Sequence, residues 1–186
     1  MYGLVNRAAK DLITKVAGAP AWEAICKEAK VPDAFVAMDT YDDSVTYDII
    51  GAASAQLDVP VEELLRQFGV HWITYTAVEG YGEMLDMWGN TLPEFLINLN
   101  SMHARIRLTM PSLKPPTFEV EPVGETGLIL KYWTERPGLQ PMVLGLLEGL
   151  GTRFGMKVEA ELTALRNETQ AFDEFKVEWS PLPKTT

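Results

Sequence analysis

Histidine is rare in this chain, and one of its two histidines stands in an unusual setting. His103 lies in an apolar stripe with Met102 and Ile106, whereas His71 is next to Trp72. A neutral imidazole on an apolar helix face suits a metal ligand, although a core histidine bonded to a backbone carbonyl is a commoner explanation. Zinc needs about three protein ligands and none follows His103 at helical spacing, whereas haem iron needs only one. If His103 binds a metal, haem therefore fits best.

A second group of polar side chains ends an apolar run later in the chain. In GLILKYWTERPG, Tyr132, Thr134 and Arg136 alternate along a predicted strand and would share one face. Leu128 and Leu130 fall on the same face, which is therefore expected to point toward the core. A buried arginine needs an acidic partner, and its guanidinium matches a carboxylate. The two carboxylates of haem would provide that partner, although a solvated strand end with a surface arginine is an equally good explanation.

The other motifs point to no further chemistry. The stretch GLLEGLGTRFG is rich in glycine but lacks the Gly-Lys-Ser/Thr of a phosphate-binding loop, and GYGEM stands in no dinucleotide-binding pattern. The paired acids Asp42/Asp43 and Glu62/Glu63 are expected to be solvated helix starts. No internal repeat or low-complexity segment is present.

Hydrophobic spacing predicts the elements that must position these residues. Helical spacing predicts helices over 3–17, 21–29, 43–57, 60–75, 81–88 and 139–152, and one from Thr91 to before Pro111 that carries His103. Alternation predicts strands over 117–121, 127–135, 157–162 and 173–179. This order predicts an α+β fold with a helical N-terminal lobe and a four-stranded antiparallel sheet with helices.

Composition limits the choice of partners and compartment. The chain has 186 residues, 47% of them hydrophobic, and a net charge of -10. Such an acidic protein is repelled by nucleic acid and by anionic membranes, so we expect neither as a partner. No apolar run approaches the roughly 20 residues of a membrane helix, and a single cysteine allows no internal disulfide. We expect a cytoplasmic protein with one domain over 1–180 and a flexible tail at 181–186.

Taken together, three of these features resemble one known family. His103 in a helix, KPP at 114–116 and the Tyr132-x-Thr134-x-Arg136 pattern resemble the H-NOX family, the haem nitric oxide/oxygen-binding domains related to the haem domain of soluble guanylate cyclase. The resemblance covers essentially the whole chain, from MYGLVN to the final strand. The family pattern has serine at the middle position, where Thr134 keeps the hydroxyl and adds a methyl group.

The resemblance implies a site for haem b, ferrous iron protoporphyrin IX, buried between the helical lobe and the sheet. It implies that His103 is the proximal iron ligand, that Tyr132, Thr134 and Arg136 hold the propionates, and that Pro116 presses on the porphyrin and distorts it. Leu99 and Met102 would contact the haem from the proximal helix. The implied distal gas pocket contains Val5, Ala9, Trp72, Met142 and Leu146.

The distal side determines which gas is expected to bind. Oxygen-binding members of the family use a distal tyrosine as a hydrogen-bond donor, and the stretch RPGLQPMVLGLLEG places Met142 at that position. Methionine cannot donate a hydrogen bond. We therefore expect a ferrous five-coordinate haem that binds nitric oxide and carbon monoxide and excludes dioxygen. The indole of Trp72 is a donor but is expected to serve as bulk, and neither Tyr75 nor Tyr81 is expected in the pocket.

The resemblance also implies how a signal would leave the domain. Nitric oxide would weaken the bond between iron and His103, the haem would relax against Pro116, and the helices would shift. The output would go to a separate effector, such as a histidine kinase, a cyclic-di-nucleotide enzyme or a chemotaxis-type receptor, and the acidic surface favours a basic docking face. The chain itself is expected to be no enzyme.

Two other functions remain open from the residues alone. A haem enzyme of the peroxidase type would need a distal acid/base, and His71 is the only candidate. If Trp72 faces the haem, His71 is turned about 100° away along the helix, which counts against this function. The third candidate is a module that binds an organic acid through Arg136 without haem.

Overall fold

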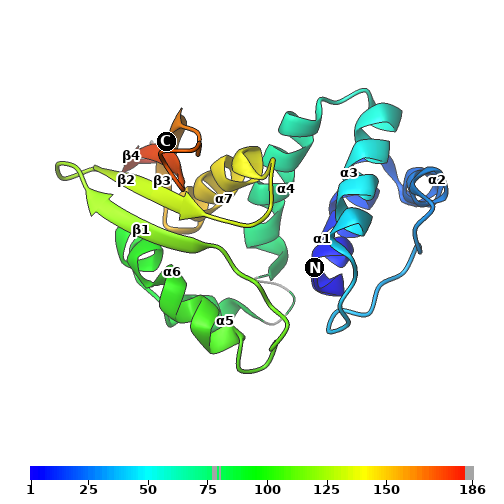
Figure 1. Cartoon of the computed structure of the whole chain (residues 1–186), viewed down its shortest axis with the longest axis horizontal. Coiled ribbons are helices and arrows are strands. Elements are labelled where there is room, and N and C mark those ends of the chain that lie inside the picture. The colour runs from blue at the N-terminus through cyan, green and yellow to red at the C-terminus, as the bar shows by residue number, and fades with distance from the viewer. Residues whose placement is uncertain (77–78, 80, 183–186) are drawn as a thin grey trace.

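The computed structural model describes residues 1–76, 79 and 81–182. Three helices form an N-terminal lobe: α1 (Gly3–Ala17), α2 (Ala19–Ala29) and α3 (Asp43–Leu57). The other elements are α4 (Val61–Thr76), α5 (Gly82–Asp86), α6 (Leu92–Ile106), β1 (Thr117–Pro122), β2 (Gly127–Trp133), α7 (Gln140–Arg153), β3 (Met156–Ala164) and β4 (Asp173–Pro181). Figure 1 shows the helical lobe on one side of the molecule and the sheet on the other.

The four strands form one antiparallel sheet in the order β1-β2-β4-β3. Tyr132 in β2 pairs with Phe118 in β1 and with Asp173 in β4. The inner face of β2 and β4 is buried and mostly apolar: Asp173 lies on it opposite Tyr132, and its other members are Leu128, Leu130, Tyr132, Phe175 and Val177. The outer face carries charged side chains, because alternate residues of a strand point to opposite sides of the sheet. The α+β fold predicted from the sequence is therefore confirmed.

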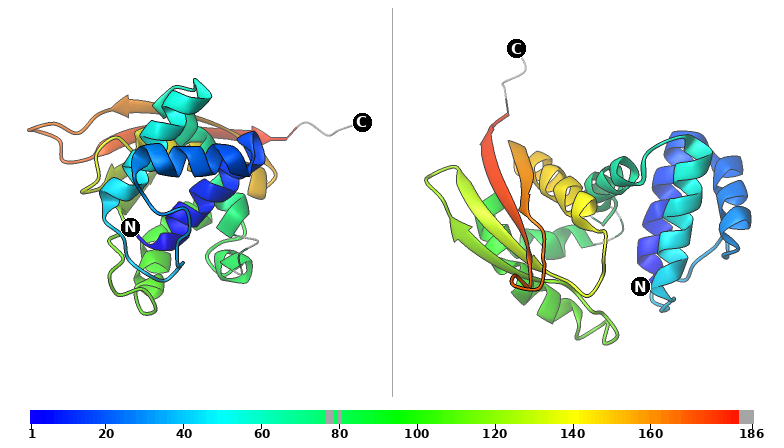
Figure 2. Two further views of the ribbon diagram at one scale, coloured as in Figure 1. Left: turned by 90° about the vertical axis from the view of Figure 1, so that its right-hand side faces the viewer. Right: turned by 45° about the horizontal axis from the view of Figure 1, so that its top comes forward.

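Two long helices, α4 and α7, lie side by side between the lobe and the sheet (Figure 2). Glycines permit this close packing: a Cβ atom on Gly145 would lie 1.9 Å from the backbone oxygen of Arg66, and one on Gly69 would lie 2.2 Å from that of Met142. Such distances are far below van der Waals contact, so neither position has room for a side chain. This crossing places side chains of α4 and α7 along one wall of the space between the N-terminal lobe and the sheet.

We expect Gly145→Ala to destabilise the protein by about 1–3 kcal/mol, because the added methyl group forces α4 and α7 apart. Gly51→Ala is the matched control: it also lies in a helix, but a Cβ atom there would meet nothing within 4 Å. That substitution should stabilise the protein by about 0.5–1 kcal/mol, the usual gain for alanine over glycine in a helix. Urea unfolding of the two variants measures both changes, and equal stabilities would contradict the packing argument.

The predicted elements are all present, with small shifts at their ends. The helix that carries His103 ends at Ile106 and is followed by turns, so it stops well before Pro111. The hydroxyl of Thr91 caps this helix by accepting from the backbone N–H of Glu94 at 3.4 Å. Strand β2 ends at Trp133, two residues earlier than predicted, which changes the placement of the polar residues that follow it.

The first residue of the predicted flexible tail, Pro181, belongs to a strand. Strand β4 continues through Pro181, and the backbone N–H of Leu182 donates to the oxygen of Gly155 at 3.2 Å. Residues 183–186, the remainder of the predicted tail, lie outside the described residues. Among the described residues, no helix has the length and apolar character needed to cross a membrane.

Candidate functional site

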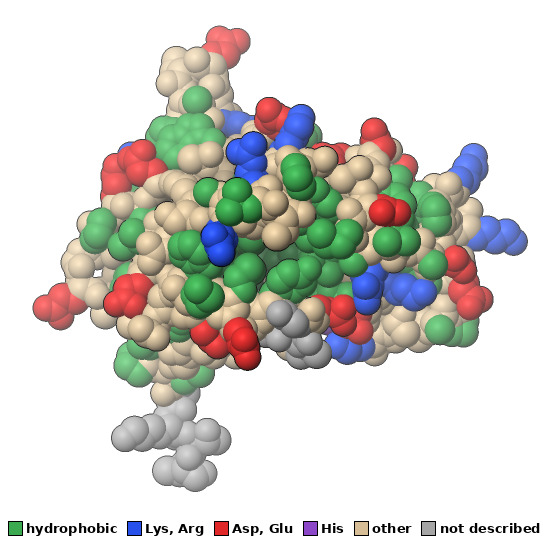
Figure 3. Space-filling model, turned by 90° about the horizontal axis from the view of Figure 1, so that it is seen from below, with side chains coloured by type: hydrophobic (Ala, Val, Ile, Leu, Met, Phe, Trp, Pro, Cys, Tyr) green, Lys and Arg blue, Asp and Glu red, His purple; other side chains and the backbone are tan. Residues whose placement is uncertain are grey.

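A cavity of about 680 Å³ lies between the N-terminal lobe and the rest of the molecule. Most of the lining side chains are apolar, and they come from α1, α3, α4, α5, α6, α7, the sheet and the segments 40–42 and 112–116. Figure 3 shows hydrophobic side chains gathered around a hollow in the middle of one face. The volume falls within the roughly 300–1,000 Å³ typical of sites that bury a small-molecule cofactor.

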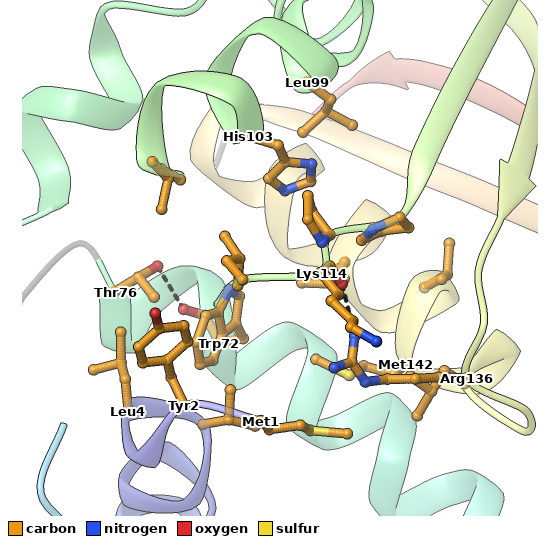
Figure 4. A pocket seen from close by; sticks show the side chains of 18 of the residues that line it. Met1, Tyr2, Leu4, Trp72, Thr76, Leu99, His103, Lys114, Arg136 and Met142 are labelled. Carbon is orange, nitrogen blue, oxygen red and sulfur yellow. Dashed lines mark hydrogen bonds between the residues drawn. The ribbon is translucent and has the colours of Figure 1, made fainter. Parts of the chain in front are cut away.

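Helix α6 presents His103 to this cavity, and Leu99 and Met102 line the same wall. Figure 4 shows the imidazole directed from α6 toward the part of the cavity where Trp72 lies. Burial lowers the pKa of His103 to about 4, and the backbone of Pro116 offsets only part of this effect. The ring is therefore neutral at pH 7. Its Nδ1 atom is buried and has no hydrogen-bond partner among the described residues, so the side chain is not a fully satisfied core histidine.

Arg136 lies at one end of the cavity and already has an acidic partner within the chain. Its Nε donates to Asp43 Oδ2 at 2.7 Å and its Nη2 to Asp43 Oδ1 at 3.3 Å. Its Nη1 donates to the backbone oxygen of Lys114 at 2.8 Å (Figure 4). These bonds use three of the five guanidinium N–H groups, which leaves two for a carboxylate of a bound ligand.

The role of Asp43 corrects the expectation that both acids at this helix start are solvated. Asp42 fits that expectation, because it is exposed and its Oδ1 accepts from the backbone N–H of Ser44 at 2.8 Å. Asp43 is instead half-buried and forms an ion pair with Arg136 at 2.7 Å. Burial acts to raise the pKa of Asp43, but the hydrogen bond and the charge of Arg136 hold it below its usual value. Asp43 thus joins α3 of the lobe to the segment after β2.

We call residues 132–136 the clamp segment. Tyr132 is buried on the inner face of the sheet and lines the cavity, and its ring centre lies 5.5 Å from that of Phe118. Burial raises the pKa of Tyr132, while a hydrogen bond with Thr134 opposes the rise. The hydroxyl of Thr134 accepts from the backbone N–H of Arg136 at 3.1 Å, and Thr134 does not line the cavity.

The expectation that the three polar residues share one strand face is therefore wrong. It holds for Tyr132, which follows Leu128 and Leu130 on the inner face. Beyond Trp133 the chain leaves the strand, so the alternation ends and Arg136 reaches the cavity through a turn. Tyr132 and Arg136 thus both line the cavity, but only Tyr132 does so from the strand, and Thr134 contacts the backbone of Arg136 instead.

The opposite wall of the cavity contains most of the residues expected in the gas pocket. Val5, Trp72, Met142 and Leu146 line it, whereas Ala9 is buried within the lobe and does not. In Figure 4, Trp72 and Met142 lie across the cavity from His103. The close packing of α4 against α7 places these two side chains on adjoining helices.

Thr76 and Tyr81 are among the polar residues that line the cavity without having been expected there. The hydroxyl of Thr76 donates to the backbone oxygen of Trp72 at 2.7 Å, so its proton is already committed. Tyr81 corrects the expectation that neither it nor Tyr75 reaches the pocket; Tyr75 is buried elsewhere. The indole of Trp72 and the phenols of Tyr81 and Tyr2 are therefore the donors to consider on this wall; Tyr2 lies beside Trp72 (Figure 4), and its hydroxyl accepts from the backbone N–H of Ser112 at 3.1 Å.

His71 does not reach the cavity. Its side chain is 10% exposed, and its Nε2 lies 2.9 Å from Oδ2 of Asp11 on α1. Trp72, the next residue, faces the cavity, as expected for neighbours that are about 100° apart on a helix. The only histidine that could have served as a distal acid/base is therefore turned toward the lobe.

Burial lowers the pKa of His71 below 6.5, and the charge of Asp11 opposes but does not cancel this effect; Lys15 adds to it. The neutral ring therefore stabilises the folded state above pH 6.5, and this contribution is lost as the pH falls through the folded-state pKa. We expect the difference in unfolding free energy between the parent protein and His71→Gln to be constant above that pH and to shrink below it. Urea unfolding from pH 5 to 8 measures it. A difference that grows in acid would show that Asp11 dominates.

These residues fit a flat, largely apolar cofactor that carries carboxylates on one edge and a metal needing a single protein ligand. The neutral imidazole of His103 supplies that ligand, and Arg136 and Tyr132 supply donors at one end. Among the described residues, no group of three or more His, Cys, Asp or Glu side chains could hold a bare metal ion. Haem has the required chemistry.

Comparison with known sequences agrees with this description. The family model described as haem-NO-binding matches residues 2–162. The soluble guanylate cyclase gcy-37 of Caenorhabditis elegans is 36% identical over 164 residues, which are 86% of this chain and 23% of that protein. The soluble guanylate cyclase gcy-31 of the same organism is 28% identical over 170 residues, or 90% of this chain and 24% of that protein. This chain thus spans about a quarter of the length of these relatives.

Solved structures share the fold over nearly the whole chain. The H-NOX protein from S. oneidensis in the Fe(II)NO ligation state has a TM-score of 0.86 and 16% identity, covering 97% of this chain and 99% of that one. The unliganded Fe(II) H-NOX protein from K. algicida has a TM-score of 0.85 and 21% identity, covering 100% of both chains. At these identities the likeness shows a common fold.

Proposed function

This chain belongs to the haem-NO-binding family, a family of haem-based gas sensors, and from that premise we propose that it is a sensor domain for nitric oxide. Haem b would occupy the cavity, and its ferrous iron would bind nitric oxide and carbon monoxide but not dioxygen. The observation that carries the proposal is the neutral, incompletely bonded His103, which faces an apolar wall across a cavity that ends at Arg136. Residues 1–180 would act as a single domain.

Different residues of the chain would hold different parts of the cofactor. His103 would be the only protein ligand of the iron, and Leu99 and Met102 would pack beside it. The two remaining N–H groups of Arg136 and the hydroxyl of Tyr132 would bind the propionates. Thr134 would act indirectly, because its hydroxyl accepts from the backbone N–H of Arg136 and so positions that residue. Pro116, which lines the cavity beside His103, would press on the porphyrin.

The distal wall supports discrimination between the gases. Dioxygen takes more negative charge from ferrous iron than nitric oxide does, so it loses more when no donor is present. Met142, Leu146 and Val5 cannot donate, and the hydroxyl of Thr76 is committed to a backbone oxygen. We therefore propose that Trp72, Tyr2 and Tyr81 serve as bulk on this wall, and that dioxygen is excluded for lack of a donor directed at it.

The absorption spectrum of the reduced protein tests the proposal directly. We expect one haem per chain and a spectrum of five-coordinate ferrous haem that air does not change, whereas added nitric oxide or carbon monoxide shifts the Soret band. A spectrum that changes reversibly in air would show that Trp72, Tyr2 or Tyr81 donates to dioxygen. Failure to take up haem on reconstitution would refute the haem proposal and leave the organic-acid module.

We also propose that the output is a movement of α6 and the N-terminal lobe that a separate effector detects. Support comes from the relatives, which are guanylate cyclases as whole proteins and of which this chain spans about a quarter. A histidine kinase, a cyclic-di-nucleotide enzyme or a chemotaxis-type receptor would serve the same purpose, and the net charge of -10 favours a basic docking face. The peroxidase alternative is weakened because His71 points away from the cavity.

A further inference from the structure

The backbone of the clamp segment is held from outside the sheet. Strand β2 ends at Trp133, so the residues after it are not fixed by the strand ladder. One guanidinium takes over this role: Arg166 donates through Nη1 to the backbone oxygen of Thr134 and through Nη2 to that of Arg136 at 3.3 Å. Because the guanidinium is planar and rigid, two bonds from it fix the turn from which Arg136 reaches the cavity.

A fully buried carboxylate fixes the backbone from which Arg166 extends. Asp173 is 0% exposed, and its Oδ1 accepts from the backbone N–H of Arg166 at 2.8 Å. Its Oδ2 accepts from Nε2 of Gln140 at 2.8 Å. A buried carboxylate is costly unless it is hydrogen-bonded, and here both oxygens are used. Asp173 also pairs with Tyr132 in the sheet, so the cluster lies directly beside the clamp segment.

The same carboxylate reaches the helix on the distal side of the cavity. Gln140 is the first residue of α7, two positions before Met142. The cluster of Gln140, Arg166 and Asp173 therefore joins the clamp segment to the start of this helix. None of the three lines the cavity, so each can influence a bound group only through other residues.

We propose that Arg166, held by Asp173, is a positioning residue that sets how firmly the clamp segment retains a carboxylate-bearing cofactor. Asp43 holds the guanidinium end of Arg136, and Arg166 holds its backbone end. Loss of Arg166 frees the turn without removing any group that touches the cofactor. This inference rests on the proposed haem function for its first test but not for its second.

The first test measures transfer of haem from the holoprotein to an excess of a haem-scavenging apoglobin. Arg166→Met should release haem about tenfold faster, the factor that corresponds to one charge-assisted hydrogen bond. Arg166→Lys, which can bind one carbonyl but not both in a fixed plane, should give an intermediate rate. Lys176→Met is the control, because it removes one positive charge from the exposed face of β4 and should leave the rate unchanged.

A double variant distinguishes positioning from a general structural role. If Arg166 acts through Arg136, adding Arg166→Met to Arg136→Gln should not accelerate haem loss beyond Arg136→Gln alone. Independent, multiplying effects of the two substitutions would overturn the proposal.

The second test needs no haem. Amide hydrogen exchange of the full chain prepared without haem should be faster at residues 134–136 in Arg166→Met, above all at Arg136, whose N–H donates to Thr134, with the global unfolding free energy nearly unchanged. Unchanged exchange at these residues would refute the positioning role, whether or not the parent protein binds haem. Failure of the parent to bind haem would refute the proposed function alone, so the two failures can be told apart.

Discussion

His103→Gly is expected to remove the iron ligand and to lower the affinity for haem at least about 100-fold. Loss of a residue that only hydrogen-bonds to a metal ligand already lowers metal affinity by up to about 100-fold. The reason is that His103 is the only imidazole in the cavity wall of the described chain. The apolar walls and Arg136 remain in this variant, so weak binding of haem can persist. The ratio of Soret to protein absorbance after reconstitution, and a titration with haem, measure the loss.

Two comparisons make the result specific. The glycine leaves space for free imidazole, which should restore haem binding if coordination, and not packing, is what was lost. His71→Gln replaces the other histidine, which faces Asp11 outside the cavity, and should retain one haem per chain. Full haem content in His103→Gly without imidazole would show that another residue binds the iron.

Met142→Tyr is expected to raise the affinity for dioxygen about 10- to 100-fold, the range that corresponds to one hydrogen bond to a charged acceptor. Met142 lines the distal wall at the start of α7 and has no donor group. A phenol at this position would supply the missing donor to dioxygen, and it should affect nitric oxide less, because nitric oxide takes less charge from the iron. Spectra of the reduced variant at increasing oxygen pressure measure the change.

Met142→Phe is the matched control, because it adds the same ring without the hydroxyl group. It should remain unchanged in air, which separates hydrogen bonding from a change of shape. Equal oxygen affinities in the tyrosine and phenylalanine variants would contradict the donor argument. If the parent protein already binds dioxygen, Trp72→Phe, Tyr2→Phe and Tyr81→Phe should show which of these three donors is responsible.

Much of the fold could be predicted because its causes are local. Apolar residues at helical spacing define α1, α4 and α6, and alternation defines the four strands, with ends within a few residues of those observed. The apolar stripe around His103 correctly indicated that α6 turns this histidine toward an apolar space. The resemblance to a known family added the assignment of that space to haem, which spacing alone left open.

The sequence by itself determined the order and type of the elements and the chemistry of the residues that could meet in a site. Only the tertiary structure decided that Asp43 would bond to Arg136, 93 positions away, and that Arg166 would hold the clamp segment. It also decided that Val5 lines the cavity while Ala9 is buried in the lobe. The physical reason is that periodicity reports which side of an element is apolar, whereas hydrogen-bond partners depend on how distant segments pack. At Trp133, where the strand ends and a turn begins, the local pattern no longer indicates where a side chain points.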